Sequence, residues 1–360
     1  MKRRLVPDKD KESRHTVMLT ATAVLMAIIM ALFGCSSGSQ KEAGESTDSS
    51  EQTPETVLSE DDADGKFTIA VLPDTQQEVV SAPAIEGEHF RNRTEWLSDN
   101  AGDLDLRFVI HTGDVVNWDT PEHEQFEIAS YAIEALDDAD IPVALCLGNH
   151  DTAAVGPGGS AADPPNTVYR VRDTSTFNSY FSTERYPDCI TFEEGKTDNA
   201  CQTFYAAGKK WLVMNLELWP RAEVIEWADT MVSVYSDYNV IIATHSYLTG
   251  NGDIYTKSDY GATSPKYLFD NLISKYENIK FVFCGHTGSA LTRMDVGENG
   301  NKIVTFLGAF HSNEKNPVQL IEIDTENGSV STRFFSPIDE QEWSQYNAEI
   351  DGIEFVEPET

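Results

Sequence analysis

The chain has 360 residues, enough for one large domain or two smaller ones, and its 40% apolar and 10% aromatic residues can build a buried core. The formal net charge is −34, and no cluster of Lys and Arg follows residue 35. Nucleic-acid binding depends on such clusters to neutralise phosphates, so the composition argues against nucleic acid as a general partner.

The first 34 residues have the pattern of a targeting segment. A basic start is followed by an uncharged stretch over 16–34, and Leu32-Phe33-Gly34-Cys35 resembles a bacterial lipobox. Cleavage before Cys35 would leave an exported lipoprotein anchored in the cell membrane and facing the outside, whereas an uncleaved 19-residue run is long enough for a transmembrane anchor. We predict a lipoprotein signal peptide over 1–34. Residues 35–64 are rich in Ser, Gly, Glu, Asp and Thr, which predicts a flexible acidic linker.

Five apolar runs then end on side chains that bind metals. The runs cover 67–73, 108–112, 141–147, 240–243 and 279–284. The side chains that follow them are Asp74, Asp114, Asn149 with His150 and Asp151, His245, and His286. Functional sites of α/β sheets lie at the carboxyl ends of strands, and carboxylate, amide and imidazole together suit a divalent cation. The pattern predicts a metalloenzyme.

Helical patterns alternate with these runs. Thr120-Pro121 predicts a helix start, with apolar residues at helical spacing up to Leu136. Further helices are predicted after Pro220 and from Ser264-Pro265. The later runs 303–310, 318–323 and 330–335 lack helices between them, which predicts antiparallel pairs. This order favours an α/β layered domain.

The ordered set of motifs resembles the calcineurin-like metallophosphoesterases, whose pattern is D-x-H, G-D, G-N-H-[DE], a lone His and G-H-x-H. The matching segments are Asp74-Thr75-Gln76, Gly113-Asp114, Gly148-Asn149-His150-Asp151, His245 and Gly285-His286-Thr287-Gly288. The resemblance covers 65–338 and leaves 339–360 as an acidic C-terminal tail. It implies a four-layer αββα sandwich of two mixed sheets flanked by helices.

The resemblance also implies two divalent transition metals, Mn, Zn or Fe, that share the carboxylate of Asp114. The remaining ligands of the second site would be Asn149, His245 and His286. The first site departs from the family pattern, because Gln76 replaces a His and Gly288 has no side chain to offer. Either that site binds its metal weakly with water in the vacancy, or His311 or His111 supplies the missing ligand. His111 lies on a predicted buried strand, so a core role is favoured for it.

His150 is the predicted catalytic acid. The family's corresponding His contacts the phosphate and protonates the leaving oxygen, and we expect Asp151 to accept a hydrogen bond from its ring. A metal-bound hydroxide would attack phosphorus in line with the leaving group. Asn117, Tyr247 and His311 are candidate substrate contacts.

The cysteines fit export. Cys189 and Cys201 flank a polar loop of 11 residues, which in an oxidising compartment favours a local disulfide. Cys146 and Cys284 lie inside apolar strands, so they are predicted as core residues.

Two functions of different classes follow. The leading prediction is a phosphoesterase that hydrolyses a phosphate monoester or diester outside the cytoplasmic membrane. The alternative is a non-catalytic or single-metal lipoprotein that binds phosphate-containing ligands through a degenerate first site. A metallopeptidase or deaminase ranks last, because no H-E-x-x-H or P-C-x-x-C occurs.

Overall fold

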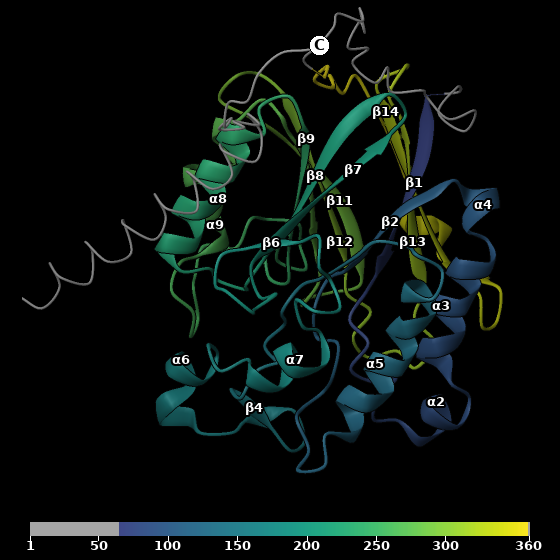
Figure 1. Ribbon diagram of the computed structural model, residues 1–360, viewed down its shortest axis with the longest axis vertical. Helices are drawn as coiled ribbons and strands as arrows, with labels where there is room; N and C mark the ends of the chain where they lie inside the picture. Colours follow the sequence, from purple (N-terminus) through teal and green to yellow (C-terminus); the bar gives the residue numbers. More distant parts are fainter. Residues whose placement is uncertain (1–64, 359–360) are drawn as a thin grey trace, which may run out of the picture. The chain divides into compact units, whose positions relative to one another are not determined.

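The computed structural model describes residues 65–358, and this range contains two seven-stranded mixed sheets packed face to face (Figure 1). The first sheet has the order β15-β14-β13-β1-β2-β3, with β16 beside β14. Its strands are β1 (Lys66–Leu72), β2 (Leu106–His111), β3 (Val143–Leu145), β13 (Val318–Asp324), β14 (Ser329–Ser336), β15 (Gln341–Glu342) and β16 (Ala348–Asp351). β1, β2 and β3 run parallel, and β13 and β14 join them antiparallel.

The second sheet has the order β11-β12-β10-β9-β8-β7-β6. Its strands are β6 (Ile190–Thr191), β7 (Ala200–Ala206), β8 (Lys209–Leu216), β9 (Asn239–Thr244), β10 (Ile279–Cys284), β11 (Ala290–Val296) and β12 (Lys302–Gly308). The four central strands β8, β9, β10 and β12 are parallel, so their carboxyl ends meet at one edge.

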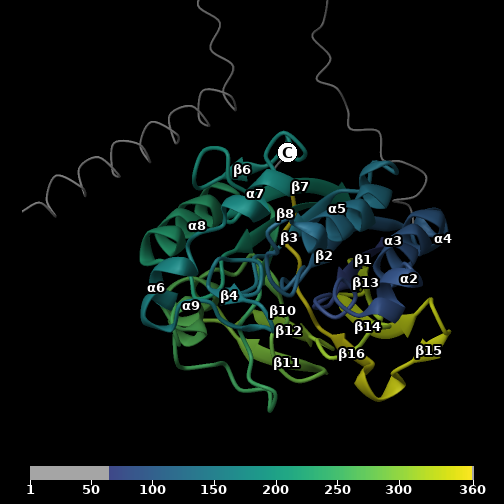
Figure 2. The same cartoon turned by 90° about the horizontal axis from the view of Figure 1, so that it is seen from below.

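Helices cover the outer face of each sheet (Figures 1 and 2). The first sheet carries α2 (Ala82–Glu86), α3 (His89–Asp99), α4 (Ala101–Leu104) and α5 (Glu124–Asp137), and the second carries α8 (Ala222–Val234) and α9 (Pro265–Asn271). The connection from β3 to β6 forms β4 (Val155–Gly156), β5 (Ser160–Ala161), α6 (Thr167–Arg170) and α7 (Ser175–Tyr180). Between residues 65 and 358 the 3₁₀ turns are η2 (Pro164–Asn166), η3 (Ile273–Lys275) and η4 (Ser344–Tyr346). The predicted four-layer αββα sandwich is confirmed.

Strand β1 is apolar except for Lys66 and Thr68. Phe67, Ile69 and Val71 point into the core between the two sheets, whereas Ala70 and Leu72 point into the core beneath the helices. Successive side chains of a strand point to opposite faces, so a strand covered on both faces is mostly apolar.

Several predicted boundaries need correction. The helix predicted from Pro121 begins at Glu124, because Thr120 accepts a hydrogen bond from the backbone N of Glu124 (3.1 Å) and holds a turn before the helix. The run 303–310 gives β12, which pairs antiparallel with β11 but parallel with β10. Helix α3 was not predicted, because few of its residues are apolar. The helix after Pro220 is confirmed with its buried face.

The segment predicted as an acidic tail contributes to the fold. β15 and β16 both pair with β14, and Trp343 and Tyr346 pack against Phe310 and Phe334. The backbone N of Val356 donates to the side chain of Asn239 (2.9 Å). The folded unit therefore extends well past residue 338. The prediction of a tail was based on charge and overlooked these spaced aromatic residues.

The predicted Cys189–Cys201 disulfide is wrong in this structure, where both thiols are free. Ile190 lies opposite Cys201 in the β6–β7 pair, so Cys189 is displaced by one position from Cys201. Cys146 and Cys284 are buried, as predicted. No helix in the range 65–358 is long and apolar enough to cross a membrane. The predicted signal peptide, Cys35 and the linker 35–64 lie outside the described residues.

Candidate metal centre

Asp114 is the central residue of the candidate site. It follows β2 with a positive φ of 51° and is 2% exposed. Its Oδ2 lies 3.2 Å from Nε2 of His245, and its Oδ1 accepts a hydrogen bond from the backbone N of His150 (3.0 Å). Gly148 permits this approach, because a Cβ at that position would lie 2.1 Å from Oδ1 of Asp114. The chain therefore places this carboxylate where several loops meet.

The two histidines of the predicted second site lie beside Asp114. They follow the neighbouring parallel strands β9 and β10, so both emerge at the same edge of the second sheet. Nε2 of His245 and Nδ1 of His286 are 3.1 Å apart, and ligand atoms of Asp114, His245 and His286 all lie within 4.8 Å of one another. The other ring nitrogen of His245, Nδ1, is 2.8 Å from the backbone O of Thr112. A carbonyl only accepts, so Nδ1 carries the proton and Nε2 faces the site.

Asp74 and Gln76 reach the same place from the loop after β1. Asp74 is fully buried, and its Oδ2 accepts a hydrogen bond from the backbone N of His286 (3.0 Å). Nε2 of Gln76 donates to Oδ2 of Asp114 (3.3 Å). Residues from both sheets thus converge on one centre, as predicted.

Gly288 is unsuited to carry the missing histidine. Its φ is +73°, and a Cβ there would approach Cα of Gly250 to 3.3 Å. Both features disfavour a side chain, so the loop after β10 has adapted to glycine. The first site is correspondingly poorer in ligands than the family pattern.

The centre contains strongly perturbed ionisable groups. Burial alone would raise the pKa of Asp114, but the nearby imidazoles of His245 and His150 outweigh it and hold the pKa below its ordinary value. Burial raises the pKa of Asp74 well above its usual range. For His245, burial opposes protonation, but the charge of Asp114 prevails and raises the pKa to about 9. Burial lowers the pKa of His286 to about 3. Such opposed shifts within one cluster are typical of functional sites.

Buried oxygen atoms without hydrogen-bond partners indicate whether these residues could bind a metal. Oε1 of Gln76 and Oδ1 of Asn149 are buried and make no hydrogen bond to the described chain. A buried oxygen without a donor is costly, and a cation would satisfy it. Two free amide oxygens, two carboxylates and two imidazoles form a donor set that suits Mn, Zn or Fe. The residues present therefore fit divalent cations.

His150 lies at the edge of the centre, with its side chain 16% exposed. Its Nδ1 lies 2.6 Å from the backbone O of Asn117, which must accept, and its Nε2 is 3.9 Å from Oδ2 of Asp114. The predicted contact with Asp151 is wrong. Asp151 accepts hydrogen bonds from the backbone N of Val116 (3.0 Å) and of Gly148 (2.8 Å) instead. It joins the two loops that carry Asp114 and Asn149, and burial raises its pKa to about 7.

The three predicted substrate contacts have different surroundings. Asn117 is 6% exposed, and it orients His150 through its carbonyl. Tyr247 is fully buried, which contradicts its predicted contact with substrate. His311 is half-buried, its Nδ1 lacks a partner in the described chain, and burial lowers its pKa against the opposing charge of Asp114. His111 is fully buried behind the site, 3.0 Å from the Thr75 hydroxyl, and is no ligand.

Sequence reasoning missed the support of Asp74. The Nδ2 of Asn316 donates to the backbone O of Asp74 (2.7 Å), and the backbone N of Asn316 donates to Glu78 (3.3 Å). Glu78 pairs with Arg93 in a fully buried ion pair. The only signal in the sequence was an Arg within a charged segment. Its burial could be recognised only once helix α3 was placed.

Comparison with known proteins agrees with this architecture. The model of the family described as calcineurin-like phosphoesterase matches residues 67–289, so the chain belongs to that family, and its donor set is that of a metal-binding phosphoesterase. The chain is similar to the uncharacterized protein YvnB of Bacillus subtilis (strain 168), with 24% identity over 282 residues. That match covers 75% of this chain but spans only 20% of YvnB.

Two solved structures resemble the chain. A dimetal phosphatase from Danio rerio matches with 11% identity and a TM-score of 0.47, over 79% of this chain and 98% of that one. The NAD nucleotidase of Haemophilus influenzae matches with 12% identity and a TM-score of 0.42, over 79% of this chain and 49% of that one.

Proposed function

We propose that this protein hydrolyses a phosphate monoester or diester, using two divalent metal ions held by the candidate centre. The observation that carries the proposal is the convergence of Asp114, His245 and His286 within 4.8 Å, beside the unpartnered amide oxygens of Gln76 and Asn149. The ligand atoms of Asp114, His245 and His286 therefore already lie close together.

The metals and the chain would divide the reaction between them. When bound, the cations supply an activated water and neutralise the charge that develops on the phosphoryl oxygens. Asp114 would bridge both sites, with Asp74 and Gln76 on one side and Asn149, His245 and His286 on the other.

His150 would protonate the leaving oxygen. The carbonyl of Asn117 fixes its ring through Nδ1, which leaves Nε2 directed toward the side of Asp114. A proton on Nε2 can then pass to the alkoxide as the P–O bond breaks. His150 is close to the loop after β4, because a Cβ at Gly159 would lie 3.3 Å from its ring. This loop, Asn117 and His311 are the proposed substrate contacts.

We also propose that the protein is exported and held at the outer face of the cell membrane by a lipid on Cys35. The support is the basic start, the uncharged run and the lipobox-like sequence before Cys35. Cys35→Ser should abolish the incorporation of labelled fatty acid and leave the signal peptide uncleaved. A wild-type protein that takes up no labelled fatty acid, or a Cys35→Ser variant that is still labelled and cleaved, would contradict the lipid anchor.

A second candidate function is a phosphate-ligand-binding lipoprotein with one metal or none. Gln76 and Gly288 favour it, because they leave the first site with fewer strong ligands. The ordered setting of His150 favours the enzyme, since a binding protein has no need of an oriented acid.

The test uses purified protein loaded with Mn, Zn, Fe or Ni. We expect at least one transition metal per chain by elemental analysis, and turnover of an aryl phosphate monoester or diester. Metal binding without turnover of either ester would favour the binding protein. Absence of both metal and turnover would contradict the enzyme and the single-metal form of the binding protein, and would leave only its metal-free form.

A further inference from the structure

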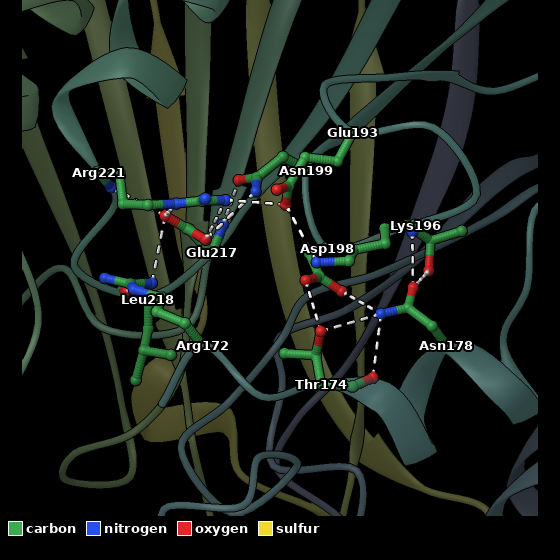
Figure 3. A network of polar contacts seen from close by, with 11 residues as sticks. Arg172, Thr174, Asn178, Glu193, Lys196, Asp198, Asn199, Glu217, Leu218 and Arg221 are labelled. Atoms are coloured by element: carbon green, nitrogen blue, oxygen red, sulfur yellow. Dashed lines mark hydrogen bonds and ion pairs between the residues drawn. The ribbon is translucent and has the colours of Figure 1, made fainter. Parts of the chain in front are cut away.

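A polar network joins the end of β8 to the segment after α6 (Figure 3). Its central residue is Glu217, which is 1% exposed. The Glu217 carboxylate accepts hydrogen bonds from Nε of Arg221 (3.0 Å) and Nδ2 of Asn199 (3.3 Å), and Nη1 of Arg172 lies 3.2 Å from it. Figure 3 shows this carboxylate between the two guanidinium groups. Because two guanidinium groups and an amide contact it, the Glu217 carboxylate is held rigidly.

Arg172 extends this network to the next two residues of the chain. Its Nη1 donates to the backbone O of Leu218 (3.3 Å), and its Nη2 donates to the backbone O of Trp219 (2.7 Å). Trp219 has a φ of 45°, a left-handed conformation that is unfavourable for a bulky residue. The guanidinium therefore holds a strained turn that would otherwise relax.

The strained turn places the indole of Trp219 against a metal ligand. The ring centroids of Trp219 and His286 are 5.8 Å apart, and the two planes are perpendicular. Tyr260 packs edge-on against the same indole at 4.7 Å. Edge-to-face contacts of this kind fix the relative orientation of two rings.

His286 depends on this contact more than His245 does. The ring of His245 is oriented by a hydrogen bond from Nδ1 to the backbone O of Thr112. In the described part of the chain, Nε2 of His286 has no hydrogen-bond partner among the protein groups, although Nδ1 faces His245. Ligand histidines are usually oriented by a hydrogen bond through the second nitrogen. For His286, packing takes that place.

We propose that Trp219, held by Arg172 and Glu217, is a positioning residue that orients the imidazole of His286 toward the metal. This inference rests on the proposed function, because it gives His286 the role of ligand. The indole itself is 1% exposed and does not reach the substrate. Its effect passes through the ring of His286.

The test measures metal binding with Co²⁺ and Zn²⁺ alone. Trp219→Leu keeps an apolar side chain but removes the aromatic edge, so the affinity from chelator competition should fall by about 10–100-fold. The visible absorption of bound Co²⁺ should change, since it reports the ligand geometry. Trp219→Phe retains an aromatic ring without the indole N–H, and it should restore most of the affinity and the spectrum.

Trp227 on α8 is the matched control. Within residues 65–358, Nε1 of both Trp219 and Trp227 lacks a hydrogen-bond partner, but the indole of Trp227 packs against Phe192 rather than against His286. Trp227→Leu should leave both the affinity and the Co²⁺ spectrum unchanged. An equal loss of metal affinity in Trp227→Leu would show that the loss in Trp219→Leu reflects general destabilisation, and it would overturn the proposal.

Arg172→Lys tests the support without touching the indole, and it serves if Trp219→Leu fails to fold. Lysine keeps the charge beside Glu217 but cannot donate to two carbonyls in the geometry of a guanidinium. Metal affinity should fall by about 3–10-fold, within the range for outer contacts. Arg185 is the control, because it joins Asp137 and the backbone O of Ser130 at a distance from the centre. Arg185→Lys should not alter metal affinity.

The outcomes separate this inference from the proposed function. A wild-type protein that binds no metal would defeat the proposed function itself. A wild-type protein that binds metal, together with folded Trp219→Leu or Arg172→Lys variants of unchanged affinity and spectrum, would overturn only the role of Trp219.

Discussion

The two halves of the metal centre are built on different principles. In the second half, His245 and His286 follow neighbouring parallel strands, so the sheet itself brings their rings together. In the first half, Asp74 and Gln76 lie on a single loop after β1, and Gly288 contributes no side chain. The second half therefore inherits its geometry from the sheet, whereas the first depends on how one loop is held.

The support behind each half reflects this difference. Asp74 is held by a fully buried chain of contacts through Asn316, Glu78 and Arg93. His286 is held by packing against Trp219. A loop needs buried hydrogen bonds to fix it, because it lacks the ladder that fixes a strand end. From this difference between the two halves we expect tight metal binding in the second half and weaker metal binding in the first.

Removing the group that both halves share should have the largest effect. Asp114→Asn keeps the shape of the side chain but removes the charge that both cations would share, so metal content should fall to background. Turnover of an aryl phosphate should fall by at least about 10³-fold. Elemental analysis and initial rates measure the two effects, with the surface variant Asp163→Asn as control. Retention of both metals would show that the halves are independent.

His150→Ala should separate the catalytic acid from both metal sites. Metal content should stay at the wild-type level, while turnover falls by about 10²–10⁴-fold. The loss should be greater for a phenyl or alkyl phosphate than for a 4-nitrophenyl ester, whose leaving group needs no proton. The control is His123→Ala, which alters a partly exposed histidine that pairs with Asp119. An equal loss on both classes of ester would contradict the role of acid.

The contrast between the halves also explains what could be predicted from sequence. Strand periodicity and the ligands after each strand define the sandwich and place Asp114, His245 and His286 together, because these features depend on local pattern. The partner of His150 could not be predicted. A carbonyl, that of Asn117, occupies the position expected for Asp151, and any residue can supply a carbonyl. Trp219 and Arg172 act through a turn with unusual backbone angles, which composition does not reveal.

The pH dependence of metal binding tests the second half. In the metal-free protein the charge of Asp114 outweighs burial and raises the pKa of His245 to about 9, so at neutral pH this imidazole carries a proton that a metal must displace. Raising the pH removes the proton and favours the complex. Apparent affinity should rise by about tenfold per pH unit between pH 6 and 8. Chelator competition at several pH values measures this apparent metal affinity. His245→Asn should bind more weakly and lose this dependence, and a flat wild-type profile would contradict the assignment.

The smallest expected effect concerns the first half and sharpens the comparison most directly. Gln76→His replaces a neutral amide oxygen with an imidazole, which binds Mn, Zn and Fe more strongly, so the weaker of two metal affinities should improve by roughly tenfold, or about 1.4 kcal/mol. Gln76→Ala should weaken the same affinity and leave the tighter one unchanged. Gly288→His should not help, because the positive φ and the close approach to Gly250 disfavour a side chain at that position. Isothermal titration calorimetry with the metal ion resolves the two affinities. If Gln76→His changed the tighter affinity instead, the division of the centre into a strong and a weak half would be wrong.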